Sequence, residues 1–171
     1  MRVARCAEIL AGRHGVDTSK ARLAGLLHDL ARLYTPEELL RESEARGFTI
    51  APHERAHPML LHARLGAAIA REQFGVDDAQ VLSAIEKHTT AAGDMSRLDC
   101  VVYLADSLEP KRTFAERAEM WNLAMRDLDD AMLRVLLLTL SHHARGARPA
   151  APETLAAIAR FELVGARASA S

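Results

Sequence analysis

The most informative segment of the chain is Leu26-Leu27-His28-Asp29-Leu30-Ala31. It sets a histidine beside an aspartate within an otherwise apolar helical run. An unpaired carboxylate in apolar surroundings is costly in free energy, so the pair needs a partner that satisfies it. A divalent metal ion would satisfy both side chains. The stretch therefore indicates a metal site inside a helical protein.

Three further groups of metal-ligand type follow within apolar helical patterns or at their ends: His62, His88 and Asp106. Imidazole and carboxylate together suit Fe, Mn, Co or Zn better than a metal that prefers thiolate. Because a helix turns once in 3.6 residues, His28 and Asp29 project about 100° apart and can face one cleft. A carboxylate can bridge two ions, and two ions roughly 3.5–4 Å apart can clamp a phosphate oxygen. Hydrolysis of a phosphate ester or anhydride is therefore the natural reaction class.

Each of these residues taken singly has an ordinary structural explanation, since a lone helical histidine is more often a hydrogen-bonded core or surface residue than a ligand. That explanation is applied to the other histidines His14, His53, His142 and His143, while His57 stays ambiguous. The ordered set of five residues is what favours a metal centre.

The composition predicts one all-α domain. Hydrophobic residues make up 49% of the 171 residues and aromatic residues only 4%, so the core must consist mainly of Leu, Ala, Val and Ile. The net charge of −1 argues against a nucleic-acid partner and against a polybasic membrane patch. Cys6 and Cys100 are too few for a disulfide framework. The apolar stretch over 133–140 is too short to span a bilayer, and no signal peptide is expected. These features predict a cytoplasmic protein.

Periodicity and capping residues divide the chain into helices, predicted over 2–14, 17–30, 35–47, 58–74, 77–88, 96–106, 115–126, 129–143 and from 152 onward. Connecting loops are predicted over 48–58 and 89–95. We expect a main domain over 1–145, a C-terminal helix within 146–165 packed on that domain after a linker at 147–151, and a frayed tail over 166–171.

Four segments together resemble a known family. They are Leu27-His28-Asp29, Leu61-His62-Ala63, His88-Thr89-Thr90 and Ala105-Asp106-Ser107-Leu108-Glu109-Pro110-Lys111-Arg112. From about Arg2 to Leu140 the sequence is similar to the HD-domain superfamily of metal-dependent phosphohydrolases. Within it the sequence resembles the YqeK branch, the symmetrical diadenosine tetraphosphate hydrolases. The His-Thr-Thr segment with Met95 and the Ala-Asp-x-x-Glu-Pro-x-Arg segment are specific to that branch.

The resemblance implies an HD-domain helical bundle that holds two divalent metal ions, commonly iron, with Mn or Co as alternatives. It implies the metal ligands His28, Asp29, His62, His88 and Asp106, with Asp29 bridging the ions and so taking a catalytic part. The implied reaction is attack of water at a central phosphorus of diadenosine tetraphosphate, which gives two ADP. Candidates for contact with the phosphates are Arg32, Arg64 and Arg112, with Thr89 as a hydroxyl donor. A homodimer is left open.

The sequence departs from the family pattern in two places. The family usually has Gly after His-Thr-Thr, whereas Ala91 and Ala92 stand here, which we expect to alter the loop without changing its length. The family's first metal-ligand histidine aligns two residues before Met1. Arg2 cannot replace it, because arginine stays charged and has no acceptor. His14 lies roughly 18 Å further along the helix. We therefore expect a native start upstream of Met1, without which one metal position has a ligand fewer.

Two alternatives to the diadenosine tetraphosphate hydrolase stay open. One is an HD phosphohydrolase that acts on another nucleotide, since a fold does not fix a substrate. The other is a non-catalytic module that binds a nucleotide or a partner and keeps a degraded metal site. A panel of substrates separates the first alternative, and metal and nucleotide binding without turnover would indicate the second.

Overall fold

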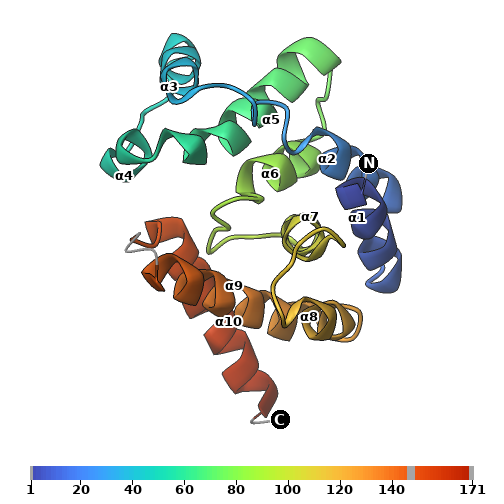
Figure 1. Cartoon of the computed structure of the whole chain (residues 1–171). Coiled ribbons are helices and arrows are strands. Elements are labelled where there is room, and N and C mark those ends of the chain that lie inside the picture. The colour runs from blue at the N-terminus through green and yellow to red at the C-terminus, as the bar shows by residue number, and fades with distance from the viewer. Residues whose placement is uncertain (1, 146–148, 170–171) are drawn as a thin grey trace.

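Ten α-helices and one short 3-10 helix build the part of the chain that the computed structural model describes, residues 2–145 and 149–169 (Figure 1). No strand occurs in those residues, and the all-α prediction is confirmed. The elements are α1 (Arg2–Arg13), α2 (Thr18–Leu27), α3 (Pro36–Ala45), α4 (Pro52–Ala56), η1 (Pro58–Leu60), α5 (Leu61–Phe74), α6 (Ala79–Lys87), α7 (Arg97–Leu108), α8 (Arg117–Ala124), α9 (Leu128–Arg145) and α10 (Pro152–Ser169).

Side-chain caps set where several helices begin. The Asp17 carboxylate accepts hydrogen bonds from the first backbone N–H groups of α2. Thr35 forms a capping box with Glu38 at the start of α3, and Ser96 forms one with Asp99 at the start of α7. Each cap satisfies backbone donors that have no partner inside the helix. The predicted helix starts at these three places are therefore close to those observed.

One predicted helix ends earlier than the periodicity indicated, and another ends where it was predicted, near His88. Helix α2 ends at Leu27 rather than near Leu30, and His28 is its C-terminal cap. Helix α6 ends at Lys87, with His88 as its cap. The apolar pattern continues past the end of α2 because Leu30 and Ala31 are partly and fully buried. These two helix ends are where the candidate ligands lie.

Two further differences concern segments that were predicted to lack helix. The loop predicted over 48–58 contains α4 and leads into η1, where Glu54 accepts a hydrogen bond from the Ala51 N–H at the start of α4. Helix α10 continues to Ser169, beyond the start of the predicted tail. Of the predicted linker over 147–151, residues 147 and 148 lie outside the described residues.

Helix α7 is the central element of the bundle, and it is buried along most of its length. Helices α1, α2 and α6 pack against it on one side, and α8 and α9 on another, with α10 packed on α9 (Figure 1). A smaller apolar cluster joins α3 to α5 through Leu39, Leu61, Leu65 and Ile69. Among the described helices none has the length and apolar character needed to cross a membrane.

Close packing of α1 on α2 holds the C-terminal end of α2, which leads into His28, in a fixed position. An added Cβ at Gly25 would lie 2.8 Å from the Cα of Ala4 and 3.0 Å from its backbone nitrogen. Only glycine fits at this crossing, because the obstacle is backbone rather than the end of a flexible side chain. Gly25 is also the residue whose carbonyl faces the His28 ring.

We predict that Gly25→Ala lowers the free energy of unfolding by about 1–3 kcal/mol, the usual cost of overpacking. The matched control is Gly12→Ala, since a Cβ at Gly12 meets nothing closer than the Thr18 Cγ2 at 3.6 Å. Alanine is favoured over glycine in helices, so the control should be neutral or stabilising by up to about 1 kcal/mol. Urea unfolding monitored by circular dichroism measures both. Equal midpoints for the two variants would contradict the close approach.

Candidate metal centre

Three histidine rings are fixed in the same way, each by a backbone carbonyl three residues earlier. The Nδ1 atom of each ring lies within hydrogen-bond distance of that carbonyl oxygen. The pairs are His28 with Gly25 (3.0 Å), His62 with Met59 (2.5 Å) and His88 with Ile85 (2.6 Å). A carbonyl can only accept, so each Nδ1 carries the proton and donates it. In the neutral ring, Nε2 is then left with its lone pair available to a metal ion.

Helix ends supply these carbonyls. His28 and His88 cap α2 and α6, where backbone C=O groups have no partner within the helix. His62 lies in the first turn of α5 and bonds to a carbonyl of η1. The three side chains are buried, with residue exposures of 7%, 5% and 3% in chain order. Their rings approach edge to face, with centroids 5.0 Å apart for His28 and His88 and 5.1 Å for His62 and His88.

Asp29 connects the rings through its two carboxylate oxygens. Its Oδ1 lies 3.4 Å from the Nε2 of His62 and 3.7 Å from that of His88. Its Oδ2 lies 3.3 Å from the Nε2 of His28, which is also 3.6 Å from the Oδ1 of Asp106. The Asp29 side chain is 44% exposed, so the cluster is open to solvent on this side. A carboxylate placed in this way has the geometry of a bridging ligand.

The five predicted ligands are thus brought together, and they form two groups that share one histidine. Ligand atoms of His28, His88 and Asp106 lie within 4.8 Å of one another, and so do those of Asp29, His62 and His88. The donor set is three imidazole nitrogens and two carboxylates, which suits a borderline divalent metal such as Fe, Mn, Co or Zn.

The contact between two of the rings supports a cation at this place. The Nε2 atoms of His62 and His88 are 3.2 Å apart, and each Nδ1 already donates to a carbonyl. Burial lowers the pKa of His88, which keeps that ring neutral. With each Nδ1 committed to a carbonyl, the two Nε2 atoms are the nitrogens that face each other, and a bound cation satisfies this arrangement. The residues therefore fit a divalent metal.

The two carboxylates keep their negative charge. Burial would raise the pKa of Asp29, but the neighbouring histidines outweigh it and hold that pKa far below its usual range, above all the His28 ring, whose own raised pKa keeps it charged beside the carboxylate. Burial opposes ionisation of Asp106 as well, yet His28 and the charge of Arg112 lower its pKa. For His28, burial favours the neutral ring, but hydrogen bonds to Asp106 and Asp29 overcome this effect and raise its pKa to about 9.

Among the four residues predicted to contact phosphate, two lie beside the cluster. Arg112 forms an ion pair with the Oδ1 of Asp106 at 2.7 Å. The Thr89 hydroxyl lies 3.2 Å from the Nε2 of His62 and 3.1 Å from that of His88. Arg32 is exposed on the turn that follows Asp29. All three are within the segments that carry the metal ligands or follow them directly.

The structure does not bring Arg64 into the cluster. Its guanidinium lies 4.3 Å from the centre of the Phe48 ring and donates to the Thr49 carbonyl at 3.0 Å. It also lines a separate cavity together with Arg71 and Glu86. Residues two apart on a helix project about 200° apart, so Arg64 and His62 point to opposite sides of α5.

Sequence reasoning assigned no role to Glu109, although it stands in the family-like segment. Its carboxylate is buried and accepts hydrogen bonds from the Arg2 Nε at 2.8 Å and from the Lys111 N–H at 3.2 Å. It thereby ties the start of α1 to the turn that brings Arg112 back to Asp106. The sequence feature that could have pointed to Glu109 is its position directly before Pro110 at the end of a helix.

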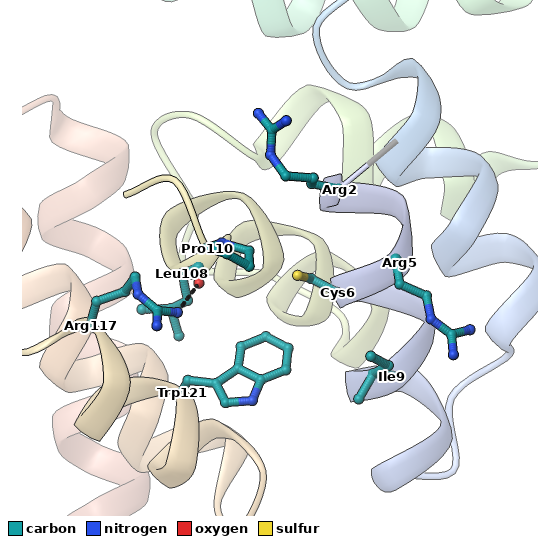
Figure 2. Close-up of a pocket in the computed structure, with 8 residues that line it drawn as sticks. All are labelled: Arg2, Arg5, Cys6, Ile9, Leu108, Pro110, Arg117 and Trp121. Atoms are coloured by element: carbon teal, nitrogen blue, oxygen red, sulfur yellow. Dashed lines mark hydrogen bonds between the residues drawn. The ribbon is translucent and has the colours of Figure 1, made fainter. Parts of the chain in front are cut away.

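A separate cavity of about 400 Å³ lies between α1, the end of α7 and α8 (Figure 2). Its walls are mainly apolar, with Cys6, Leu108 and Trp121 facing the space and arginines at the rim. Arg117 donates to the Leu108 carbonyl at 3.0 Å, the dashed line in Figure 2. None of the five clustered ligands lines this cavity.

Comparisons with known proteins agree with this geometry. A family model described as the HD domain matches residues 1–111. The chain is 34% identical over 145 residues to a symmetrical bis(5'-nucleosyl)-tetraphosphatase of Bacillus subtilis, a match that covers 85% of the chain and 77% of that protein. A protein of the same name from Halalkalibacterium halodurans is 35% identical over 150 residues, covering 86% and 78%.

A solved structure is also similar. It is the crystal structure of a predicted HD superfamily hydrolase involved in NAD metabolism from Clostridium acetobutylicum. It superposes with a TM-score of 0.91 at 33% sequence identity and covers 94% of this chain and 85% of that one. The helical arrangement described above is therefore shared with a solved relative.

We predict that Mn²⁺ added to chelator-treated protein raises the thermal unfolding midpoint, since a ligand that binds only the folded state stabilises it by about 2.7 kcal/mol at 100 times its Kd. His88→Gln removes the ligand common to both groups and should abolish most of this increase. Each variant is compared with its own metal-free midpoint, so a lower intrinsic stability does not confuse the result. His57→Gln, an exposed histidine outside the cluster, is the control. An unchanged increase in His88→Gln would refute the metal site.

The raised pKa of His28 predicts a pH dependence of stability for the chelator-treated protein. The folded state holds the His28 proton more tightly than the unfolded chain, where the pKa is about 6.5. This contribution is complete below pH 6.5 and is lost as the pH rises to about 9. Urea midpoints measured from pH 6 to 9.5 should therefore fall, and His28→Gln should flatten the decline. A wild-type curve as flat as that of the variant would show that no such proton is held.

Proposed function

The chain belongs to the HD domain family, and from that premise we propose that it is a metal-dependent phosphohydrolase that cleaves diadenosine tetraphosphate symmetrically into two ADP. The observation that carries the proposal is the cluster of three Nε2 atoms and two carboxylates divided into two groups around His88. Two relatives of about 35% identity over most of the chain carry the name of this activity.

Each part of the cluster has a chemical task in this proposal. Asp29, His62 and His88 would hold one divalent ion, and His28 and Asp106 would help to hold a second. Asp29 would serve both, since its Oδ1 faces His62 and His88 and its Oδ2 faces His28, whereas the single Nε2 lone pair of His88 can bind only one ion. When bound, such ions polarise phosphate oxygens and provide an activated water at neutral pH. We propose iron as the metal, as the family resemblance implies, with manganese or cobalt as substitutes, since a donor set of imidazole and carboxylate suits all three.

The remaining residues act on the polyphosphate. Water adds to one of the two central phosphorus atoms and loses a proton to solvent, and the bond from that phosphorus to the oxygen shared with the other central phosphorus breaks, so that one ADP leaves and the attacked half becomes the second ADP. Arg112 lies next to Asp106 and can donate to a phosphate oxygen as negative charge grows on the leaving group. The Thr89 hydroxyl offers a neutral donor at the other ligand group, and the exposed Arg32 can reach the outer phosphates.

A second candidate is hydrolysis of the pyrophosphate bond in another dinucleotide. The solved relative from Clostridium acetobutylicum is described as involved in NAD metabolism, which favours including NAD among the substrates to be tested. The metal centre itself does not distinguish these substrates, since both present a phosphoanhydride between two nucleosides.

The deciding experiment is product analysis. We predict that the protein loaded with Fe²⁺ or Mn²⁺ converts diadenosine tetraphosphate to ADP alone, as resolved by ion-exchange chromatography. AMP together with ATP would mean asymmetric cleavage and would overturn the proposal. NAD and mononucleotides are assayed in parallel, and faster turnover of one of them would favour the second candidate. Nucleotide binding without turnover of any substrate would indicate a non-catalytic module.

We predict that Arg112→Gln lowers kcat/KM for diadenosine tetraphosphate by roughly 10²-fold, the usual effect of removing one donor that stabilises charge in the transition state. Arg134→Gln is the matched control, because Arg134 forms a surface ion pair with Asp130 on α9 at 3.0 Å. Metal content is measured for both, since Arg112 also touches a ligand. Equal activity of the two variants would remove Arg112 from the proposal.

A further inference from the structure

The first turns of α10 lie against the loop that follows His88. The Thr154 hydroxyl donates to the Thr90 carbonyl at 2.7 Å, and Thr154 is only 8% exposed. A Cβ built on Gly93 would lie 3.4 Å from the Cβ of Ala156. In Figure 1 this loop, which joins α6 to α7, swings out toward α9 and α10. A helix beyond the region that the family model matches therefore contacts the loop that carries Thr89.

The loop has a backbone that needs such support. Ala91 adopts φ +59°, the left-handed conformation that side chains other than glycine rarely take, and it is 1% exposed. A conformation of this kind persists only where surrounding contacts impose it. The Thr90 carbonyl belongs to the peptide unit directly before Ala91, and the hydroxyl of Thr154 holds that unit. An ion pair of Lys87 with Asp94 at 3.0 Å closes the loop from the other side.

The same turn of α10 also contacts the segment that leads to His62. The Oε2 of Glu153 lies 3.4 Å from the Nε2 of His53 in α4. Helix α4 and η1 follow each other directly, and η1 supplies the carbonyl that holds the His62 ring. Thr154 and Glu153 of α10 thus contact both the loop that follows His88 and the segment that leads to His62. The Thr89 hydroxyl lies between these two histidines.

We propose that Thr154 is a positioning residue for Thr89: its hydrogen bond to the Thr90 carbonyl keeps the Thr89 hydroxyl aimed at the ligand groups of His62 and His88. The expected effect on kcat rests on the proposed function, whereas the expected effect on the loop conformation does not. Thr154 itself touches no ligand atom of the cluster. It acts on the reaction only through the loop.

The kinetic test uses Thr154→Val, which keeps the shape of the side chain and removes the donor. We expect kcat for diadenosine tetraphosphate to fall 5- to 20-fold with KM changed less than twofold, and Thr154→Ser to restore it. The matched control is Thr139→Val, which removes a hydroxyl-to-carbonyl bond of 2.9 Å within α9 and a hydrogen bond to Tyr103 of α7. Equal kcat of the Thr154→Val and Thr139→Val variants would overturn the proposal.

A double-mutant cycle separates positioning from a general effect on the fold. Because Thr154 acts through Thr89, adding Thr154→Val to Thr89→Val should lower kcat by less than twofold more. A full 5- to 20-fold additional loss would mean that Thr154 does not act through Thr89, and would overturn the proposal.

Amide hydrogen exchange tests the structural part without any substrate. Exchange over residues 89–95 should quicken in Thr154→Val and not in Thr139→Val. If the wild type turns over no substrate while exchange shows this difference, the proposed function fails and the positioning role stands. Unchanged exchange over 89–95 would refute the positioning role whatever the activity.

Discussion

Three buried histidines each donate a hydrogen bond from Nδ1 to the backbone carbonyl three residues earlier. These bonds fix the orientation of the rings, on which the rest of the site depends. Two of those carbonyls are available because α2 and α6 end just where the histidines lie. A helix that continued regularly would bond these oxygens internally and leave the ring orientation open. The ends of α2 and α6 are therefore part of the site, and the tight contact of Gly25 with α1 fixes one of them.

Once the rings are fixed, their charges must be balanced. Burial disfavours the charged forms of the imidazoles and carboxylates, whereas the attraction between them favours those forms. The attraction is the larger effect, since the pKa of His28 is raised and the pKa values of Asp29 and Asp106 are lowered. Arg112 adds a positive charge at the edge of the cluster. A divalent cation would replace the His28 proton, so metal binding and proton release are coupled. Binding of a divalent cation would thus replace the positive charge of the His28 proton with that of the metal.

The sequence predicted the features that depend on local pattern. The five candidate ligands and the caps at Thr35 and Ser96 were recognised from local sequence, and the structure brings these five side chains together. The five-residue helix α4 was missed because it is too short to show a hydrophobic period. The ion pair of Arg2 with Glu109 joins residues 107 positions apart, and a local sequence pattern cannot predict such a contact. The position of Arg64 could have been predicted from the sequence, because side chains two residues apart on a helix, such as His62 and Arg64, point to opposite sides.

Ala91 shows how the remaining part of the chain enters the site. The family that the sequence resembles usually has glycine at this position, and the observed φ of +59° is one that glycine adopts without strain. Alanine in the left-handed region costs about 1–2 kcal/mol per residue, so something else must impose the conformation. The buried bond from Thr154 and the ion pair of Lys87 with Asp94 lie on either side of the strained residue. A substitution in the loop and a contact from the C-terminal helix are therefore two parts of one arrangement, and the metal-ligand segments alone do not define the site.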